Sequence, residues 1–199
     1  MNPLETGRAY DRITHLWDQT TFNNENGLAQ HRRALQFVGG PGTALDVGCG
    51  CTGRFVELLL DEGFTVSGID VSAKMVELAQ ARHPDVEFHQ ADICEWRLPT
   101  SYSFITAWDS IWHVPLGAQA GLLTKLVQGL TQDGVLIFSF GGTSQQGEHR
   151  DSAMGEEVYY STLGVTGVLE TVAAAGGRVR HFEYDQHPEL HAYLIAQRA

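Results

Sequence analysis

A short apolar run that passes through glycines into a helical pattern is the feature that most limits the fold of this chain. Thr43–Val47 has the composition of a buried strand, Gly48 and Gly50 follow it at once, and Gly53 precedes an amphipathic stretch over residues 54–62. Only glycine lets a backbone turn this tightly and lie against a ligand, so G-x-G-x-x-G between a strand and a helix predicts a binding loop. This arrangement favours an α/β fold that binds its ligand at the carboxyl ends of the strands.

Apolar runs alternate with amphipathic stretches along the rest of the chain, as expected for βαβ units on a parallel sheet. Further strands are predicted at residues 64–69, 86–89, 103–108 and 135–140, and further helices at residues 72–83, 123–130 and 165–175. The last two extended runs, residues 178–184 and 190–196, are joined by residues 185–189 alone. A parallel crossover needs a dozen or more residues, so these two strands should be antiparallel. The sequence therefore predicts a three-layer, doubly wound, seven-stranded sheet that is mostly parallel and has an antiparallel last strand.

Two segments lie outside this alternation. Residues 1–40 have the pattern of one or two helices and end before the break Gly39-Gly40-Pro41-Gly42. We therefore expect an N-terminal helical lid over residues 1–40 and a ligand-binding domain over residues 41–199. Residues 141–163 are rich in Gly, Ser and Gln and are expected to form a long irregular connection, which is usually functional or mobile.

Charge and hydropathy exclude several classes of partner. The 24 acidic and 13 basic residues give a formal charge of −11, which disfavours binding to a nucleic acid backbone. The chain has no apolar run of the ~20 residues that a membrane span needs, and its first residues are too polar for a signal peptide. Cys49, Cys51 and Cys94 have neither disulfide-scaffold nor zinc-site spacing. We expect a cytoplasmic protein without a metal, either a monomer or a homodimer.

Carboxylates follow the predicted strands where a bound nucleoside would lie. Asp70 stands twenty residues after Gly50, at the end of the second strand, where a carboxylate can accept both hydrogens of a ribose diol. The alternative is that Asp70 is a helix cap. An NAD-dependent oxidoreductase would also explain this loop and carboxylate. Its short-chain type needs a Tyr-x-x-x-Lys pair, and neither Lys74 nor Lys125 has a tyrosine four residues before it.

The segments LDVGCG, VSGIDVS, ADI and HAYLIAQR resemble the motifs of the class I S-adenosylmethionine-dependent methyltransferases, over about residues 43–199. The resemblance implies the strand order 3-2-1-4-5-7-6 and S-adenosylmethionine as cofactor. It implies methyl transfer to an O, N or S atom of a small molecule, and we keep a non-catalytic protein that binds the cofactor or its demethylated product as an alternative. One departure from the family's commonest loop is the pair Cys51 and Thr52, which puts two residues rather than one between the last glycines.

The resemblance also implies the cofactor contacts. The methionine and ribose part would meet the loop, Asp70 would hold the ribose hydroxyls, and the residues after the second and third strands would meet adenine. Trp108 and Asp109, after the fourth strand, would touch the methionine end. The implied set from the strand ends is Asp46, Gly48, Cys49, Gly50, Asp70, Val71, Asp92, Ile93, Trp108 and Asp109.

Aromatic and imidazole side chains are the candidates for the acceptor side. Trp112 or His113 would face the acceptor, with His113 as a candidate general base, although a lone histidine is more often structural. Tyr10 and Trp17 would close over the cofactor or, equally, pack on the sheet. The late histidines, His191 among them, are expected in a solvated turn.

Overall fold

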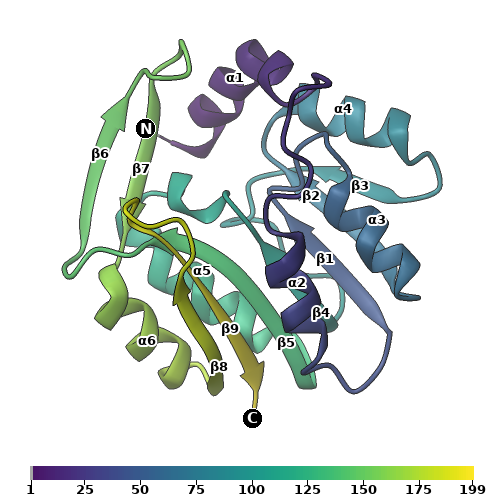
Figure 1. Cartoon of the computed structure of the whole chain (residues 1–199), viewed down its shortest axis with the longest axis vertical. Coiled ribbons are helices and arrows are strands. Elements are labelled where there is room, and N and C mark those ends of the chain that lie inside the picture. The colour runs from purple at the N-terminus through teal and green to yellow at the C-terminus, as the bar shows by residue number, and fades with distance from the viewer. Residues whose placement is uncertain (1) are drawn as a thin grey trace.

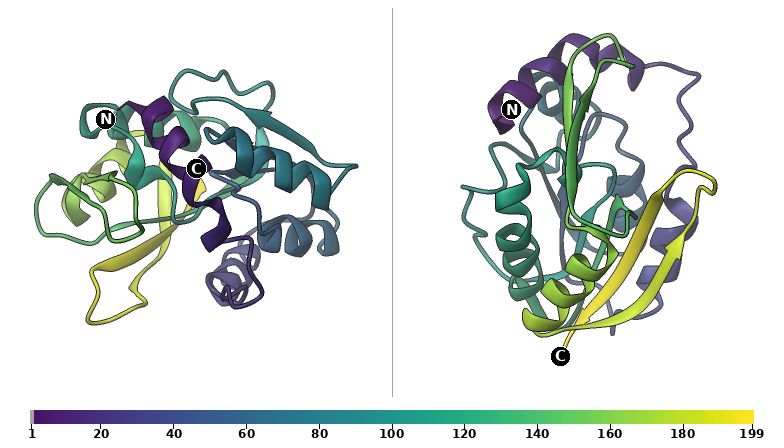
Figure 2. Two further views of the ribbon diagram at one scale, coloured as in Figure 1. Left: turned by 90° about the horizontal axis from the view of Figure 1, so that it is seen from above. Right: turned by 90° about the vertical axis from the view of Figure 1, so that its left-hand side faces the viewer.

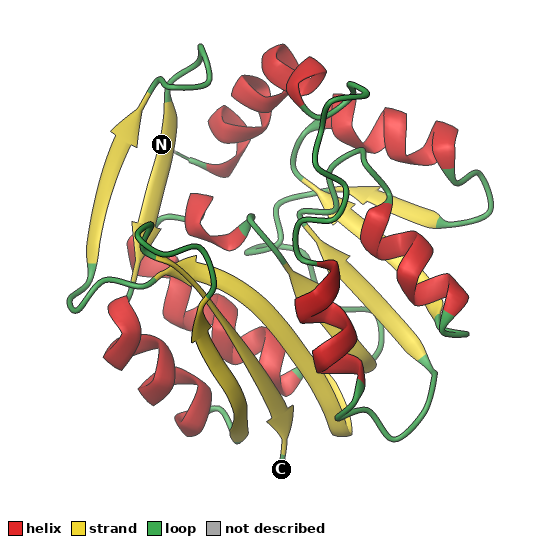
Figure 3. Cartoon of the chain, viewed as in Figure 1, coloured by secondary structure: helices red, strands yellow, loops and turns green. Residues whose placement is uncertain are grey.

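Seven strands form one twisted sheet at the centre of the molecule, with helices on both faces (Figures 1 and 3). The computed structural model describes residues 2–199 and leaves out Met1. The strand order is β3-β2-β1-β4-β5-β9-β8. The strands are β1 (Thr43–Val47), β2 (Thr65–Asp70), β3 (Glu87–Gln90), β4 (Tyr102–Ala107), β5 (Leu130–Gly141), β8 (Gly177–Tyr184) and β9 (His191–Arg198).

The pairing confirms the predicted fold class. β1 pairs with β2 and β4, β2 with β3, and β4 with β5, all in parallel. β9 lies antiparallel between β5 and β8. A separate two-stranded sheet takes the labels β6 and β7, so β8 and β9 are the sixth and seventh strands of the main sheet. The expected order 3-2-1-4-5-7-6 is therefore the one observed.

The helices form the two outer layers because neighbouring strand residues face opposite sides. Ala44 and Phe104 pack with Phe55 and Leu59 in one cluster, whereas Leu45 and its neighbours pack against α5 and α6 in the other. The helices are α1 (Pro3–Ile13), α2 (Leu28–Leu35), α3 (Arg54–Asp61), α4 (Ala73–Arg82), α5 (Leu116–Gln128) and α6 (Gly164–Ala174), with short 3-10 turns η1 (Thr14–Leu16) and η2 (Ile111–His113). The helices expected in the N-terminal segment are α1 and α2.

The segment over residues 141–163 differs from the irregular connection expected. It folds as an antiparallel ribbon of β6 (Gly147–Asp151) and β7 (Val158–Thr162), with His149 stacked on Tyr160 across the pair. Val158 is fully buried, and the run Val-Tyr-Tyr-Ser-Thr is rich in residues that favour strands. The ribbon stands beside α1 and forms a sheet of its own, next to the end of β5 (Figure 2).

One predicted boundary was also wrong. Leu130, expected at the end of the helix, begins β5, and the pairing of β4 with β5 shifts register between Tyr102 and Phe104. Leu130 is fully buried in the core cluster under α5, so apolar spacing alone did not separate the end of a helix from the start of a strand.

The residues described by the structure include no helix that is long and apolar enough to cross a membrane.

Candidate active site

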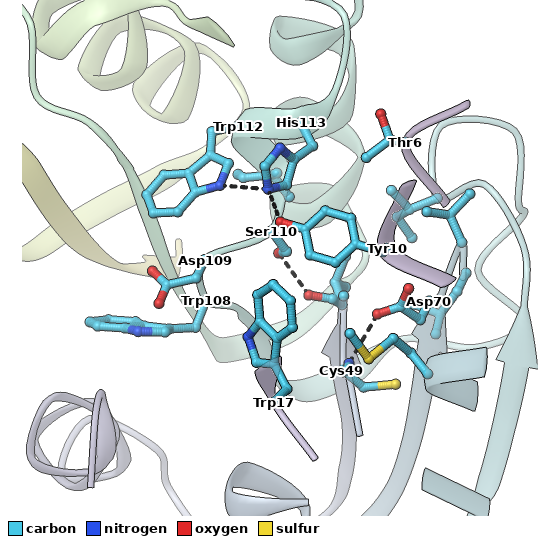
Figure 4. A pocket seen from close by; sticks show the side chains of 18 of the residues that line it. Thr6, Tyr10, Trp17, Cys49, Asp70, Trp108, Asp109, Ser110, Trp112 and His113 are labelled. Atoms are coloured by element: carbon cyan, nitrogen blue, oxygen red, sulfur yellow. Dashed lines mark hydrogen bonds between the residues drawn. The ribbon is translucent and has the colours of Figure 1, made fainter. Parts of the chain in front are cut away.

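A cavity of about 310 Å³ opens at the carboxyl ends of β1, β2 and β4. α1, residues 17–26 and the ribbon contribute the opposite walls (Figure 4). The residues expected around the cofactor, Tyr10 and Trp17 included, meet here with the exception of Asp46, and His113 joins them. Those lining the cavity are Tyr10, Trp17, Gly48, Cys49, Gly50, Asp70, Val71, Asp92, Ile93, Trp108 and Asp109.

The glycine loop takes its shape from two close approaches. Gly48 has a φ of +68°, and a Cβ there would lie 2.2 Å from the Cβ of Ser110. The Ser110 hydroxyl donates to the Val47 carbonyl at 2.8 Å, which holds the loop against the segment after β4. Gly53 has a φ of +75° and begins α3, where a Cβ would lie 2.3 Å from Nε2 of His83. Gly53 does not line the cavity. Glycine is needed at this position because the chain packs closely against His83, and not because a ligand approaches it.

Asp70 is anchored through both carboxylate oxygens. The backbone N–H of Gly50 donates to Oδ2 and that of Ser72 to Oδ1, both at 2.9 Å. Burial raises the pKa of Asp70, opposed by these backbone hydrogen bonds. The helix-cap alternative is settled by Ser72, whose hydroxyl accepts from Met75 N at the start of α4. Each Asp70 oxygen keeps acceptor capacity for a ligand, because a carboxylate oxygen has two lone pairs.

Asp46 lies apart from the other candidates. It is in β1, only 2% exposed, and it does not line the cavity, so the geometry gives no support to its expected contact with the cofactor. Burial raises its pKa to about 7, with Arg54 acting in the opposite direction and Asp70 adding to the rise. A strand residue alternates sides, which turns Asp46 away from the surface that Val47 shares with the cavity.

Replacing Asp46 tests this burial through pH. Burial raises the pKa of this carboxyl from about 3.9 in the unfolded chain to about 7 in the folded chain, so the folded chain favours the protonated form. Below pH ~4 the carboxyl is protonated in both states, and its burial then costs the fold no charge. Stability is lost as pH rises through the folded pKa. We expect Asp46→Asn to have little effect at pH 4 and to be more stable than the wild type at pH 8 in urea titrations. A wild type as stable as the variant at pH 8 would contradict the burial.

Asp92 and Ile93 lie beyond β3. The Cys94 N–H donates to Oδ1 of Asp92 at 2.8 Å, and Lys125 Nζ donates to the Ile93 carbonyl at 2.5 Å. The turn is therefore fixed on both sides, with the carboxylate and the Ile93 side chain at the cavity. Val71 completes this end of the cavity from the β2 side.

A buried ion cluster holds the segment after β4. His191 donates through Nε2 to Asp109 at 2.9 Å and through Nδ1 to Asp185, a carboxylate that is 5% exposed. Burial lowers the pKa of His191, but its bonds to the two carboxylates outweigh that effect and raise it. His191 is 8% exposed, so the solvated turn expected for it was wrong. The cluster fixes Asp109 at a left-handed φ of +52°, supported by Asp109 N donating to Ser139.

Trp108 belongs more to the core than to the cavity. It is 3% exposed and packs against His31 and Tyr193, although it also contributes to the cavity lining. Most of this side chain therefore has a structural role, and its expected contact with the methionine end of the cofactor stays a prediction.

His113 has no free ring nitrogen. Nδ1 donates to the Tyr159 carbonyl at 2.8 Å, and Nε2 accepts from Trp112 Nε1 at 3.0 Å and from the Tyr10 hydroxyl at 2.6 Å. Burial lowers the pKa of His113 to about 4. His113 is thus a neutral, fully bonded imidazole at neutral pH, which does not fit a general base in direct contact with an acceptor.

Comparison with known proteins agrees with this geometry. The family model described as "Methyltransferase domain" matches residues 44–134. Trans-aconitate 2-methyltransferase of Paracidovorax citrulli is 30% identical over 170 residues, which cover 77% of this chain and 65% of that protein. The structure of magnesium protoporphyrin IX methyltransferase from Synechocystis PCC 6803 with bound S-adenosylmethionine superposes with a TM-score of 0.75 at 18% identity, covering 100% of this chain and 98% of that one. The chain has the fold of S-adenosylmethionine-dependent methyltransferases, and its sequence is similar to theirs.

Other methyltransferases match over shorter stretches. An N,N-dimethyltransferase of dTDP-3-amino-3,6-dideoxy-alpha-D-glucopyranose from Streptomyces fradiae is 36% identical over 97 residues, 47% of this chain and 37% of that protein. The chain spans about one third to just under two thirds of the length of the first curated relatives it matches.

Three features of this site escaped the sequence analysis. Arg54, at the start of α3, lines the cavity, and its Nε donates to the Asn26 carbonyl at 3.0 Å. Asp11 of α1 accepts from the Ser72 hydroxyl at 2.7 Å and from Lys74 N at 3.0 Å. Asp185 completes the ion cluster. Each joins segments far apart in the chain, so short-range patterns carried no signal for them. Over residues 2–199 no group of three or more His, Cys, Asp or Glu side chains is arranged to hold a metal.

Proposed function

We propose that this chain binds S-adenosylmethionine in the cavity and transfers its methyl group to a small-molecule acceptor. The observation that carries the proposal is Asp70, whose two oxygens are fixed by the N–H groups of Gly50 and Ser72 at the edge of the cavity. A carboxylate held in this way beside a glycine loop is suited to a ribose diol. The antiparallel β9 supports a methyltransferase rather than an NAD-dependent enzyme, whose sheet has the order 3-2-1-4-5-6.

The lining fits the other parts of the cofactor. Val71 and Ile93 give apolar contact for adenine, and Asp92 can accept from its amino group. Gly48 brings the backbone close to the methionine part without a side chain, and Asp109 can pair with the methionine ammonium. Arg54 would pair with the carboxylate. The cofactor supplies an electrophilic methyl group on a sulfonium.

The chain's own part in the reaction is to position the reactants and exclude water, which accounts for large rate increases when the geometry is right. We propose that the part of the N-terminal segment from α1 to Trp17 acts as a lid, while α2 packs in the core. α1 is tied to α4 through Asp11, to the cavity wall through Tyr10, and to the ribbon through Arg12, which pairs with Glu156 at 2.7 Å. Trp17 lies against Tyr10, with ring centres 5.2 Å apart, and extends the lid over the glycine loop.

Methyl transfer is tested with cofactor labelled in the methyl group and a fractionated metabolite extract. We expect label from the wild-type chain to enter the small-molecule fraction and to be absent from a reaction with Asp70→Ala. Binding of the cofactor without any transfer would favour the non-catalytic alternative. Label in protein or nucleic acid would contradict the small-molecule acceptor. The relatives' names include both an N-methyltransferase and a trans-aconitate methyltransferase, so they do not decide the acceptor atom.

A further inference from the structure

The hydrogen bonds of His113 fix the direction of the bond from Tyr10 (Figure 4). A carbonyl oxygen can only accept, so His113 Nδ1, bonded to the Tyr159 carbonyl, carries the proton. An indole N–H can only donate, so Nε2, bonded to Trp112, is an acceptor. Both neighbours demand the same tautomer. The Tyr10 hydroxyl, 2.6 Å from Nε2, can therefore bond to it only as a donor, sharing the single lone pair of Nε2 with the Trp112 N–H.

This direction determines what Tyr10 offers a ligand. Its single hydrogen is used by His113, which leaves only the lone pairs of its oxygen for another partner. Tyr10 lines the cavity, so a bound molecule that meets this oxygen has to donate an N–H or O–H to it. A group that has only lone pairs, such as a carboxylate, would be repelled there.

The charges around the cavity also disfavour a ligand that carries a carboxylate. Asp70, Asp92 and Asp109 are three carboxylates in the lining. Among the described residues that line it, Arg54 is the one lysine or arginine, and its Nε and Nη1 already donate to the Asn26 carbonyl and to Thr52. Under the proposed function this guanidinium pairs with the methionine carboxylate of the cofactor. No other lysine or arginine of the lining is then available to neutralise a carboxylate on the acceptor.

Aromatic rings pack against Tyr10 and His113. The ring centres of Tyr10 and Trp17 are 5.2 Å apart, those of Tyr10 and His113 are 5.2 Å apart, and those of His113 and Tyr160 are 4.8 Å apart. Trp112 and Met154 also line the cavity, so these side chains together give it a largely aromatic and apolar wall. Such a wall favours a flat or cationic molecule.

We propose that the acceptor is a small ring-bearing amine or alcohol whose nucleophilic nitrogen or oxygen donates a hydrogen bond to Tyr10, and that the site rejects carboxylates. The inference rests on the proposed function, because it assumes that the cofactor occupies the side of Asp70 and Asp92. Tyr10 contacts the acceptor directly. His113 is a positioning residue that keeps the Tyr10 oxygen free to accept.

The tautomer can be measured without any ligand. Long-range ¹H–¹⁵N correlation spectra of the uniformly labelled full chain at pH 7, assigned with His113→Asn, should show His113 protonated at Nδ1 and bare at Nε2. The Tyr10→Phe variant should keep this tautomer, because Tyr159 and Trp112 still impose it. Protonation at Nε2 would overturn the proposal.

The acceptor class is tested with three probes that share one ring: tryptamine, tryptophol and indole-3-acetate. Each is titrated calorimetrically into the full chain saturated with S-adenosylhomocysteine. We expect the amine or the alcohol to bind at least tenfold more tightly than the acid, and Tyr10→Phe to reduce that preference about fivefold, as for one lost hydrogen bond. Tyr184→Phe, which changes an exposed tyrosine, should leave it unaltered.

Three other outcomes of these titrations would contradict the proposal. Equal or tighter binding of indole-3-acetate, or binding of none of the three probes, would overturn the proposal while leaving the proposed function intact. Failure of S-adenosylhomocysteine to bind the wild-type chain would overturn the proposed function and this inference with it.

Discussion

Asp70→Ala is expected to weaken binding of S-adenosylhomocysteine about 100-fold. Two hydrogen bonds from a ribose diol to one carboxylate contribute roughly 1.5 kcal/mol each, at the lower end of the range for charged groups, and about 3 kcal/mol corresponds to a factor of about 100 in Kd. The substitution also leaves Gly50 N without its acceptor, so the glycine loop loses the bond that fixes it beside the ligand. Isothermal titration calorimetry measures the change directly.

The matched control for Asp70 is Asp61→Ala, which removes an exposed carboxylate at the end of α3. It should bind S-adenosylhomocysteine as the wild type does. Because Asp70 also bonds to Ser72 N, thermal melting of the unliganded variant must accompany the titration. A folded Asp70→Ala chain with undiminished affinity would remove Asp70 from the binding site.

His191→Leu is expected to cause the largest loss of stability, roughly 3–5 kcal/mol, as for other broken buried ion pairs. The variant leaves Asp185, which is 5% exposed, and Asp109 facing each other without the imidazole between them. Urea unfolding at pH 6 measures the loss. The double variant with Asp185→Asn removes the stranded charge and should recover part of it, so the two substitutions will not be additive. His149→Leu, at an exposed position of the ribbon, is the matched control.

The sign of the pH dependence follows from the raised pKa of His191. Its bonds to the carboxylates favour the protonated imidazole in the folded chain. Their contribution is complete below the unfolded value of about 6.5 and is lost as pH rises through the folded pKa. The stability difference between wild type and His191→Leu should therefore shrink from pH 6 toward pH 9. A difference that grows over that range would contradict a protonated His191.

The sheet and the cofactor side of the cavity were predictable because their signals are local. Strand, glycine loop and helix succeed one another within residues 43–62, and Asp70 ends the next strand. The short link over residues 185–189 was enough to indicate the antiparallel strand, since chain length alone forbids a parallel crossover there.

The rest depended on contacts between distant segments. His191 reads as a turn residue beside Pro188, and only the folded chain places it between Asp109 and Asp185. Asp46 follows the family's pattern in sequence, yet strand alternation buries it beneath the loop. His113 was a reasonable candidate base by residue type. Its hydrogen bonds to Tyr159 of the ribbon and to Tyr10 of α1 occupy both ring nitrogens, so His113 positions Tyr10 and does not act as a base.

The most direct test of this account is a calorimetric titration of the wild-type chain with S-adenosylhomocysteine and, separately, with NAD. We predict saturable binding of one S-adenosylhomocysteine per chain, which Asp70→Ala weakens, and no heat of binding from NAD. Binding of NAD in the absence of any affinity for S-adenosylhomocysteine would contradict the assignment of the cavity to a methyltransferase cofactor.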